Sequence, residues 1–322
     1  MEEQIIDAVP AEVLDYEIQK IRKEHFLFQA SSFQVFCAPA QDIPVILTEL
    51  GRLRELTFRK IGEGTNKRMD LDEFDLHYFH LFIWDEEAKK IVGAYRLGKG
   101  MELFSEFGIH GFYTRTLFKM KKRFVPFLQQ SIELGRSFIV PEYQRKAMPL
   151  FLLWKGILHF LLSNPEYRYL LGPVSISNRF SNFSKSIMVG FIQQHYFNHD
   201  LAKYVRPRKR FSPAPVTHAD MDILFETADD IDMLDRLISD IEGDYRMPVL
   251  LRRYLQLNGR IIGFNIDPKF NECLDGLLLL DLYDVPLEKI SGRFNGWIDE
   301  TFIERFSSEN KRVQSNEPTY FY

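Results

Sequence analysis

A glutamate and an arginine inside an apolar segment are the most distinctive chemical feature of the sequence. Glu133 and Arg136 lie in SIELGRSFIV (131–140), which has the composition of a buried strand. In a regular strand, residues three apart face opposite sides, but a bulge at Gly135 would bring both charges to one side. A buried charge is costly unless it is paired or used in chemistry. The two residues are therefore either a carboxylate base and a guanidinium anchor, or charges that pair separately at a sheet edge.

A second group of charged residues lies upstream. Arg54 is on a helix predicted by the apolar spacing of residues 43–60, and Arg96 lies inside the apolar strand segment IVGAYRL. Between them are the acidic and basic residues Asp70, Asp72, Asp75 and His77. Arg96 could pair with one of these aspartates, which would satisfy a buried guanidinium. A solvated helix surface and a capped loop would explain the other charges equally well.

The elements that must hold these residues alternate between strands and helices. The apolar patterns and turn signals predict the following elements in chain order: helix 43–60, strands 77–84, 91–97 and 131–140, helix 149–162, strand 167–177, helix 181–195, helices 228–241 and 248–257, strands 260–266 and 274–282, and helix 287–306. The strand–helix–strand unit at 131–177 predicts two parallel strands joined by a crossover. Residues 98–125 are predicted to be irregular. The fold class is therefore mixed α/β or α+β.

Composition excludes several classes of protein. The chain has 322 residues, a formal net charge of −4 and two cysteines, Cys37 and Cys273. These numbers disfavour a disulfide framework, a zinc cluster and a nucleic-acid-binding surface. The longest apolar run, 148–162, is shorter than the roughly 20 residues of a membrane span, and the acidic N-terminus lacks a secretion signal. We therefore predict a cytoplasmic protein that has no metal site and no permanently bound cofactor.

Several segments in series resemble one family. They are GRLRELTFRKIGEGT (51–65), DLDEFDLHYFHLFIWD (70–85), KIVGAYRLG (90–98), ELGRSFIVPEYQ (133–144), LFLLWKGI (150–157), LLGPVSIS (170–177), FNIDPKF (264–270) and LDGLLLLDL (274–282). Together they resemble the hemolysin-like branch of the GNAT superfamily, which includes ornithine-lipid and glycine-lipid N-acyltransferases. They are more distantly similar to N-acyl-homoserine-lactone synthases.

The resemblance implies a fold and a domain division. The fold is a GNAT sheet, flanked by helices, whose two central parallel strands splay apart. An N-terminal arm of residues 1–40 would precede a single domain of residues 41–322. That domain would contain a core of 43–200 and 258–285, a helical insertion of 201–257 and a C-terminal helix of 286–309.

The resemblance also implies roles for individual residues. The positions similar to the amine-substrate pocket of the lactone synthases are Arg54, Phe58, Asp72, Asp75, Arg96, Glu133 and Arg136. We predict Glu133 as the base that deprotonates the amine, Arg96 or Arg136 as the anchor of an acceptor carboxylate, and Tyr196 or Tyr143 as the proton donor to the thiolate. Sixteen of the 29 phenylalanines lie between Phe74 and Phe197, which suggests an acyl channel. Its predicted wall residues are Phe82, Phe104, Phe107, Phe138, Phe151, Phe180 and Phe183.

The acyl thioester is predicted to lie along strand 131–140. Its oxyanion would be bound by backbone N–H groups near Phe138, Ile139 and Val140. The family's phosphate loop, [QR]xxGx[GA], is here Gln144-Arg145-Lys146-Ala147, followed by Met148 and Pro149, so the glycines are missing. This departure favours the single phosphodiester of an acyl carrier protein over the pyrophosphate of coenzyme A, while the two bases still favour a phosphate.

The predicted function is transfer of a fatty acyl group from acyl carrier protein, or from coenzyme A, to the amine of an amino acid in aminolipid synthesis. Predicted partners are the carrier protein, an O-acyltransferase and the inner membrane surface. A basic–aromatic patch of Phe118, Lys119, Lys121, Lys122, Arg123 and Phe124 could contact that surface or the carrier protein. Two alternatives remain. One is a coenzyme A-dependent enzyme for another amine, and the other is a degenerate, non-catalytic adaptor.

Overall fold

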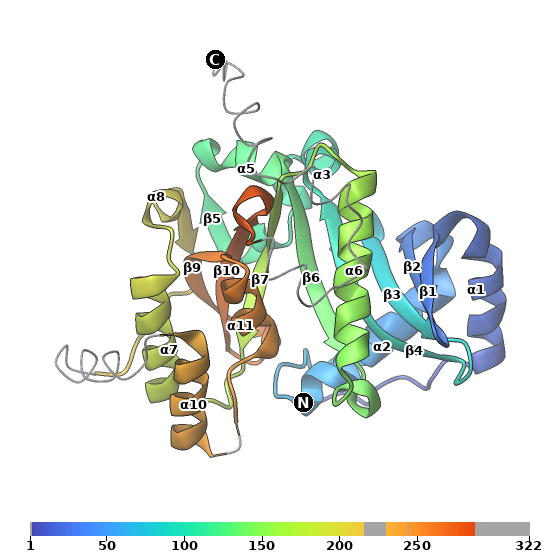
Figure 1. Ribbon diagram of the computed structural model, residues 1–322, viewed down its shortest axis with the longest axis horizontal. Coiled ribbons are helices and arrows are strands. Elements are labelled where there is room, and N and C mark those ends of the chain that lie inside the picture. Colours follow the sequence, from blue (N-terminus) through green and yellow to red (C-terminus); the bar gives the residue numbers. More distant parts are fainter. Residues whose placement is uncertain (1, 216–229, 244, 287–322) are drawn as a thin grey trace.

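An eight-stranded mixed sheet forms the centre of the protein (Figure 1). The computed structural model describes residues 2–215, 230–243 and 245–286. Within them the strand order is β1-β2-β3-β4-β6-β7-β10-β9, and only β6 and β7 pair in parallel. The strands are β1 (Phe26–Ala30), β2 (Phe33–Pro39), β3 (Phe79–Asp85), β4 (Lys90–Lys99), β6 (Ser131–Ile139), β7 (Tyr169–Ile176), β9 (Arg260–Asp267) and β10 (Cys273–Asp281).

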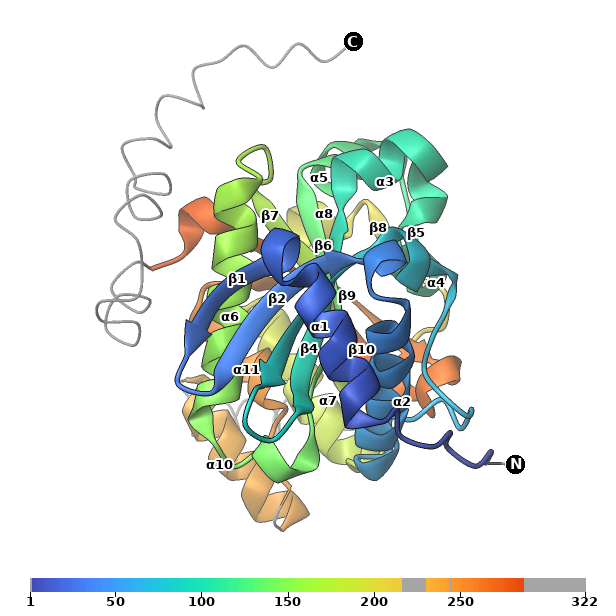
Figure 2. The same cartoon turned by 90° about the vertical axis from the view of Figure 1, so that its right-hand side faces the viewer.

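Helices cover both faces of this sheet. Helices α1 and α2 lie on one face and α6 lies on the other (Figure 2). The helices are α1 (Ala11–His25), α2 (Pro44–Lys60), α3 (Gly100–Phe107), α4 (Thr114–Leu117), α5 (Val125–Gln129), α6 (Ala147–Ser163), α7 (Asn182–His195), α8 (His199–Ala202), α10 (Ile231–Glu242) and α11 (Val249–Gln256). Within the described residues, no helix is long and apolar enough to span a bilayer.

Local sequence signals account for the helices that frame the site. Helix α2 has Pro44 in its first turn and buries Ile46, Leu50 and Leu53 at helical spacing. The side chain of Ser181 caps α7 by accepting a hydrogen bond from the Ser184 backbone N–H, as predicted. These elements agree closely with the ranges predicted from the sequence.

The two central parallel strands splay apart. Pairing between β6 and β7 is confined to residues 131–133 and 169–171. Beyond this point β6 runs on to Ile139 and β7 to Ile176 without pairing to each other. The crossover and the splayed pair are therefore as predicted, and a gap opens in the middle of the sheet.

Strand β6 contains the predicted bulge. Gly135 pairs with Arg96 and Phe138 pairs with Ala94. Between these two pairs β6 advances by three residues and β4 by only two, so β6 has one extra residue. Arg136 has φ 51°, in the left-handed region. The bulge brings Glu133 and Arg136 to the same face of the sheet.

Two sequence predictions need correction. Residues 98–125, predicted to be irregular, contain α3, α4 and the short strand β5 (Phe118–Met120). Within the predicted N-terminal arm, β1 and β2 extend the main sheet, because β2 pairs with β3 along its whole length. From residue 287 onward, the predicted C-terminal helix lies outside the described residues. The division into core and insertion stays a prediction.

Candidate active site

A cavity of about 1760 Å³ lies where β6 and β7 separate. Its walls include residues of α2 from one face of the sheet and residues of α6 and α11 from the other. Residues 134–139 of β6 and 170–175 of β7 line it between these faces. The cavity therefore lies beside the predicted thioester strand, as an acyl channel requires.

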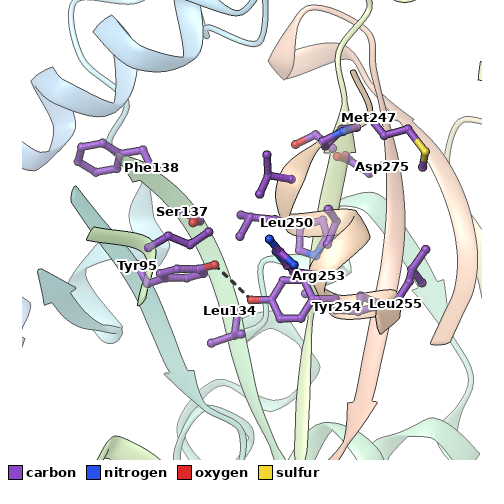
Figure 3. A pocket seen from close by; sticks show the side chains of 18 of the residues that line it. Tyr95, Leu134, Ser137, Phe138, Met247, Leu250, Arg253, Tyr254, Leu255 and Asp275 are labelled. Carbon is purple, nitrogen blue, oxygen red and sulfur yellow. Dashed lines mark hydrogen bonds between the residues drawn. The ribbon is translucent and has the colours of Figure 1, made fainter. Parts of the chain in front are cut away.

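The side of the cavity next to α6 and α11 is mostly apolar. It is lined by Leu134, Leu150, Phe151, Trp154, Leu250 and Leu278. Tyr95 of β4 and Tyr254 of α11 point toward one another from opposite walls, and their hydroxyls form a hydrogen bond of 3.3 Å (Figure 3). The Trp154 ring stacks on Tyr254 at a centroid distance of 5.4 Å. This bridge of two tyrosines limits the apolar space.

Three buried acids line the other side of the cavity. They are Glu63, just after α2, Asp267 at the end of β9 and Asp275 in β10. None of the three has an ion pair within the part of the chain that the structure describes. The Tyr113 hydroxyl donates to Asp267 at 3.2 Å. Burial raises the pKa of Glu63 to about 7, although a hydrogen bond with Ser175 opposes the rise.

Burial, reinforced by Asp267 and Glu63, also raises the pKa of Asp275 well above its usual value. Carboxyl groups that carry no salt bridge and line a cavity can bind a cation or exchange a proton. The acid-lined side is therefore suited to an amine.

A network of three arginines and three aspartates supports this region. Its members are Arg54, Arg96, Arg136, Asp70, Asp72 and Asp75. Arg54 pairs with Asp75 at 2.6 Å, and Arg96 pairs with Asp72 at 2.6 Å. Arg136 also pairs with Asp72, at 2.8 Å, which joins the bulge to the loop before β3. The predicted pairing of Arg96 with an aspartate is thus present.

The ion pairs of this network determine the protonation of Asp75 and of the neighbouring His80. Burial opposes ionisation of Asp75, but Arg54 and Arg96 hold its pKa well below the usual range. Burial and the neighbouring Arg54 lower the pKa of His80 to about 4, so this imidazole is neutral at pH 7. Among the six network residues only Arg136 lines the cavity. The network therefore holds Arg136 in place while the other ion pairs stay behind the wall.

Glu133 does not line the cavity. Its carboxylate accepts hydrogen bonds from the Tyr78 hydroxyl, from the Tyr113 backbone N–H at 2.9 Å and from the Thr114 backbone N–H at 2.8 Å. These contacts occupy the side chain in a buried position and fix the segment that carries Tyr113. The geometry does not support the predicted role of Glu133 as the base, and it indicates a positioning role instead.

The predicted thioester residues lie together at the start of α6. Phe138 and Ile139 line the cavity, and so does the segment 144–147. The side chain of Gln144 donates to the Ile139 carbonyl at 2.8 Å, which ties this segment to β6. Val140 is an exception, because its N–H donates to the Val92 carbonyl at 2.9 Å and is not available to an oxyanion.

The remaining predicted residues divide into two groups. Phe58 and Tyr196 line the cavity, as do three of the predicted channel walls, Phe138, Phe151 and Phe180. Four others do not: Phe82 is in the main core, Phe104 and Phe107 pack on a second core cluster, and Phe183 is exposed.

Sequence reasoning missed all three cavity acids. Asp267 and Asp275 lie in the apolar strand segments IIGFNID and CLDGLLLLD. An acid within such a segment is the same signal that drew attention to Glu133. Glu63 lies in the GEGT break after α2, where no periodicity marks it.

Comparisons with known proteins find similarity to an acetyltransferase family and to several acyl-transferring proteins. Residues 53–154 match the family described as the acetyltransferase (GNAT) domain. A glycine N(alpha)-acyltransferase of Phocaeicola vulgatus is 29% identical over 84% of this chain and 79% of its own length. An L-ornithine N(alpha)-acyltransferase of Agrobacterium fabrum is 32% identical over 32% of this chain and 36% of its own. A solved coenzyme A-dependent acyl-homoserine lactone synthase is 15% identical, with TM-score 0.30, over 66% of this chain and 89% of its own.

Proposed function

We propose that this protein, an N-acyltransferase with a GNAT domain, moves a fatty acyl group from a thioester to the amine of an amino acid in aminolipid synthesis. The observation that carries the proposal is the cavity at the splay, apolar on one side and acid-lined on the other. An acyl chain matches the first side and an amine matches the second. The names of the two similar acyltransferases suggest an amino acid such as glycine or ornithine as the acceptor.

The donor would enter at the start of α6 and extend along β6. Arg145 and Lys146 are exposed there and line the cavity, so they can meet a phosphate at the helix N-terminus. Pro149 removes one N–H donor from the first turn. A single phosphodiester needs fewer donors than a pyrophosphate, and this favours acyl carrier protein over coenzyme A.

In the proposed reaction the acceptor amine nitrogen attacks the thioester carbonyl carbon. Glu63 takes a proton from that nitrogen, the C–S bond breaks and the sulfur leaves as a thiol or thiolate. Backbone N–H groups at the β6 bulge, where the ladder to β4 is interrupted, would bind the oxyanion. Arg136 would face the acceptor carboxylate.

Tyr196 remains the proposed proton donor to the sulfur. It lines the cavity and is half-buried. Burial, with a contribution from Asp230, raises its pKa, so the hydroxyl keeps its proton at neutral pH. Glu133 would act through Tyr113, whose hydroxyl donates to Asp267.

A donor-by-acceptor assay tests this function. Purified protein is incubated with palmitoyl carrier protein or palmitoyl coenzyme A and with each of the common amino acids, with ornithine, and with a set of amines that lack a carboxylate. We expect an N-acyl product with one or two amino acids and a higher kcat/KM with the carrier protein. Transfer only from coenzyme A, or only to a non-amino-acid amine, would support the first alternative. No transfer from either donor would support the adaptor alternative.

Two partners follow from the same chemistry. An N-acylated amino acid carries one chain, so an O-acyltransferase that adds a second chain would act on the product. Because such a product is a lipid, we also expect this enzyme to work at the inner face of a membrane.

A further inference from the structure

We infer that a basic surface formed by two distant segments docks this protein onto an anionic membrane. The two-stranded sheet of β5 and β8 (Val205–Pro207) creates it, by pairing Lys119 with Arg206. The inference extends the proposed function by placing the membrane contact, but it rests on the surface itself and not on activity. We call the exposed residues Lys119, Lys121, Lys122, Arg123 and Arg206 the β5–β8 patch.

The patch carries five positive charges. Its members have no ion pair within residues 2–215, 230–243 and 245–286. By contrast, the nearby Lys203 and Lys209 pair with Asp200 and Glu272. Directly paired strand residues share one face, so Lys119 and Arg206 point outward together, while Phe118 and Val205 are buried beneath them. An outward concentration of positive charge on a chain of net charge −4 is complementary to an anionic partner.

One exposed apolar side chain, Met101 of α3, lies near the start of β6. Helix α5 follows β5 along the chain, and it packs against α3 (Figure 2). Gly100, which opens α3, packs against backbone at Leu128 and at Ser131, where β6 begins. Its neighbour Met101 is 48% exposed. Basic residues and an exposed apolar side chain at one end of the molecule fit a lipid surface better than a protein surface that offers charge alone.

The position of the patch also argues against the carrier protein as its partner. The patch lies at the end of the sheet where β6 begins, whereas the proposed phosphate residues 144–147 follow the other end of β6. Nine strand residues span roughly 27 Å. A carrier protein that delivers its arm to the start of α6 would therefore dock at the opposite end.

Vesicle flotation tests the patch without any assay of activity. Vesicles of phosphatidylcholine with 30% phosphatidylglycerol are compared with phosphatidylcholine alone, using wild type, Lys119→Glu/Arg206→Glu and a control, Lys23→Glu/Lys90→Glu. The control changes the net charge equally at exposed positions on α1 and β4. We expect wild type and control to float only with anionic vesicles. The patch variant should bind at least roughly 20-fold more weakly, because each basic residue contributes about fivefold.

Three outcomes would overturn the inference. They are no flotation of the wild type, equal loss of binding in the control, and unchanged vesicle binding of the patch variant with a raised KM for acyl carrier protein. The last result would make the patch a carrier-protein site. A circular dichroism melt confirms that each variant is folded. An inactive wild type that still floats would reject the proposed function and leave the patch intact.

Discussion

Glu63 is the side chain on which the proposed chemistry most depends. It lines the acid side of the cavity, and its pKa of about 7 suits proton exchange at neutral pH. We expect Glu63→Gln to lower kcat/KM by about a hundredfold or more. The pH profile of kcat/KM should also lose its rise near pH 7. Steady-state kinetics between pH 5.5 and 9 measure both effects.

Glu133→Gln is the matched control for that substitution. Since Glu133 accepts from Tyr78 and from two backbone N–H groups, its loss should lower the free energy of unfolding by about 1–3 kcal/mol. The kcat/KM of Glu133→Gln should fall, but its pH profile should keep the rise near pH 7. If Glu133→Gln removed that rise and Glu63→Gln kept it, the assignment of the base would be reversed.

Glu63 also makes stability depend on pH. The folded state raises its pKa from 4.5 to about 7, so in this interval the folded protein holds a proton that the unfolded chain releases. Stability therefore falls as pH rises from about 4.5 to 7, and the ionised carboxyl destabilises the fold above pH 7 by at most about 3 kcal/mol. Glu63→Gln should match wild type near pH 4.5 and exceed it at pH 8. Urea unfolding at the two pH values measures the difference, and equal midpoints at pH 8 would contradict it.

At the scale of elements, the approach of β7 to β6 decides where the cavity begins. A side chain at Gly172 would collide with the Leu134 carbonyl oxygen, at the point where pairing stops. Gly172→Ala should therefore cost about 1–3 kcal/mol of stability and reduce activity. Gly135→Ala is the control on β6, because a side chain there meets only Arg96, at 3.9 Å. Thermal unfolding measures both variants. A lower melting temperature for Gly135→Ala than for Gly172→Ala would contradict this prediction.

The tyrosine bridge should set the length of the acyl chain. A methylene that passed between Tyr95 and Tyr254 would gain about 0.8 kcal/mol, but it would break the hydrogen bond between their buried hydroxyls, which costs about 1–3 kcal/mol for a hydroxyl left unpaired. Tyr254→Ala should therefore shift the preferred chain upward by roughly two to four carbons. The measurement is kcat/KM for acyl donors of 10 to 20 carbons. Tyr167→Ala removes a buried tyrosine that does not line the cavity and should keep the wild-type preference. If Tyr254→Ala instead raised the KM equally for donors of every chain length, the pantetheine arm of the donor, and not its acyl chain, would lie at the tyrosine bridge.

Most of the helices and strands around the cavity could be predicted from the sequence. Periodicity and capping predicted α2, α6, α7 and the strands that frame the splay, because those signals are local. The bulge was also predictable, since a charged pair three apart around Gly135 has few ways to share one face. The acids Asp267 and Asp275 were missed because their approach to Glu63 depends on the register of β10 against β7 and β9, which no local pattern encodes.

Glu133 shows a second limit of sequence reasoning. A buried glutamate has the same sequence signal whether it faces a cavity or anchors a loop. Only the donors around it, Tyr78, Tyr113 and Thr114, distinguish the two roles. Tyr113 and Thr114 lie in the segment between α3 and β5, whose short elements lie where the sequence predicts irregular structure.

At the scale of the whole molecule, the charges are separated into three regions. One side of the cavity carries three buried acids, the β5–β8 patch is basic, and a smaller basic pair lies where the cavity meets the start of α6. This arrangement assigns the donor, the amine and the membrane to three different places on the molecule. The two basic regions should therefore respond independently to substitution.

The basic pair Arg145 and Lys146 at the start of α6 should bind the phosphate of the acyl donor. Arg145→Glu/Lys146→Glu places two negative charges where the thioester's phosphate is expected, at the N-terminus of α6, so it should raise the KM for the acyl donor by tenfold or more. The kcat should change little, because neither residue is proposed to touch the reacting atoms, and vesicle binding should stay at the wild-type level. The KM of the patch variant Lys119→Glu/Arg206→Glu for a soluble donor should in turn be unchanged. Donor KM at 50 and 300 mM salt separates the two regions, because a screened phosphate contact weakens with salt in wild type and not in the Arg145→Glu/Lys146→Glu variant. If that variant left the donor KM unaltered, the thioester would enter the cavity by another route, and the preference for a carrier protein would lose its structural basis.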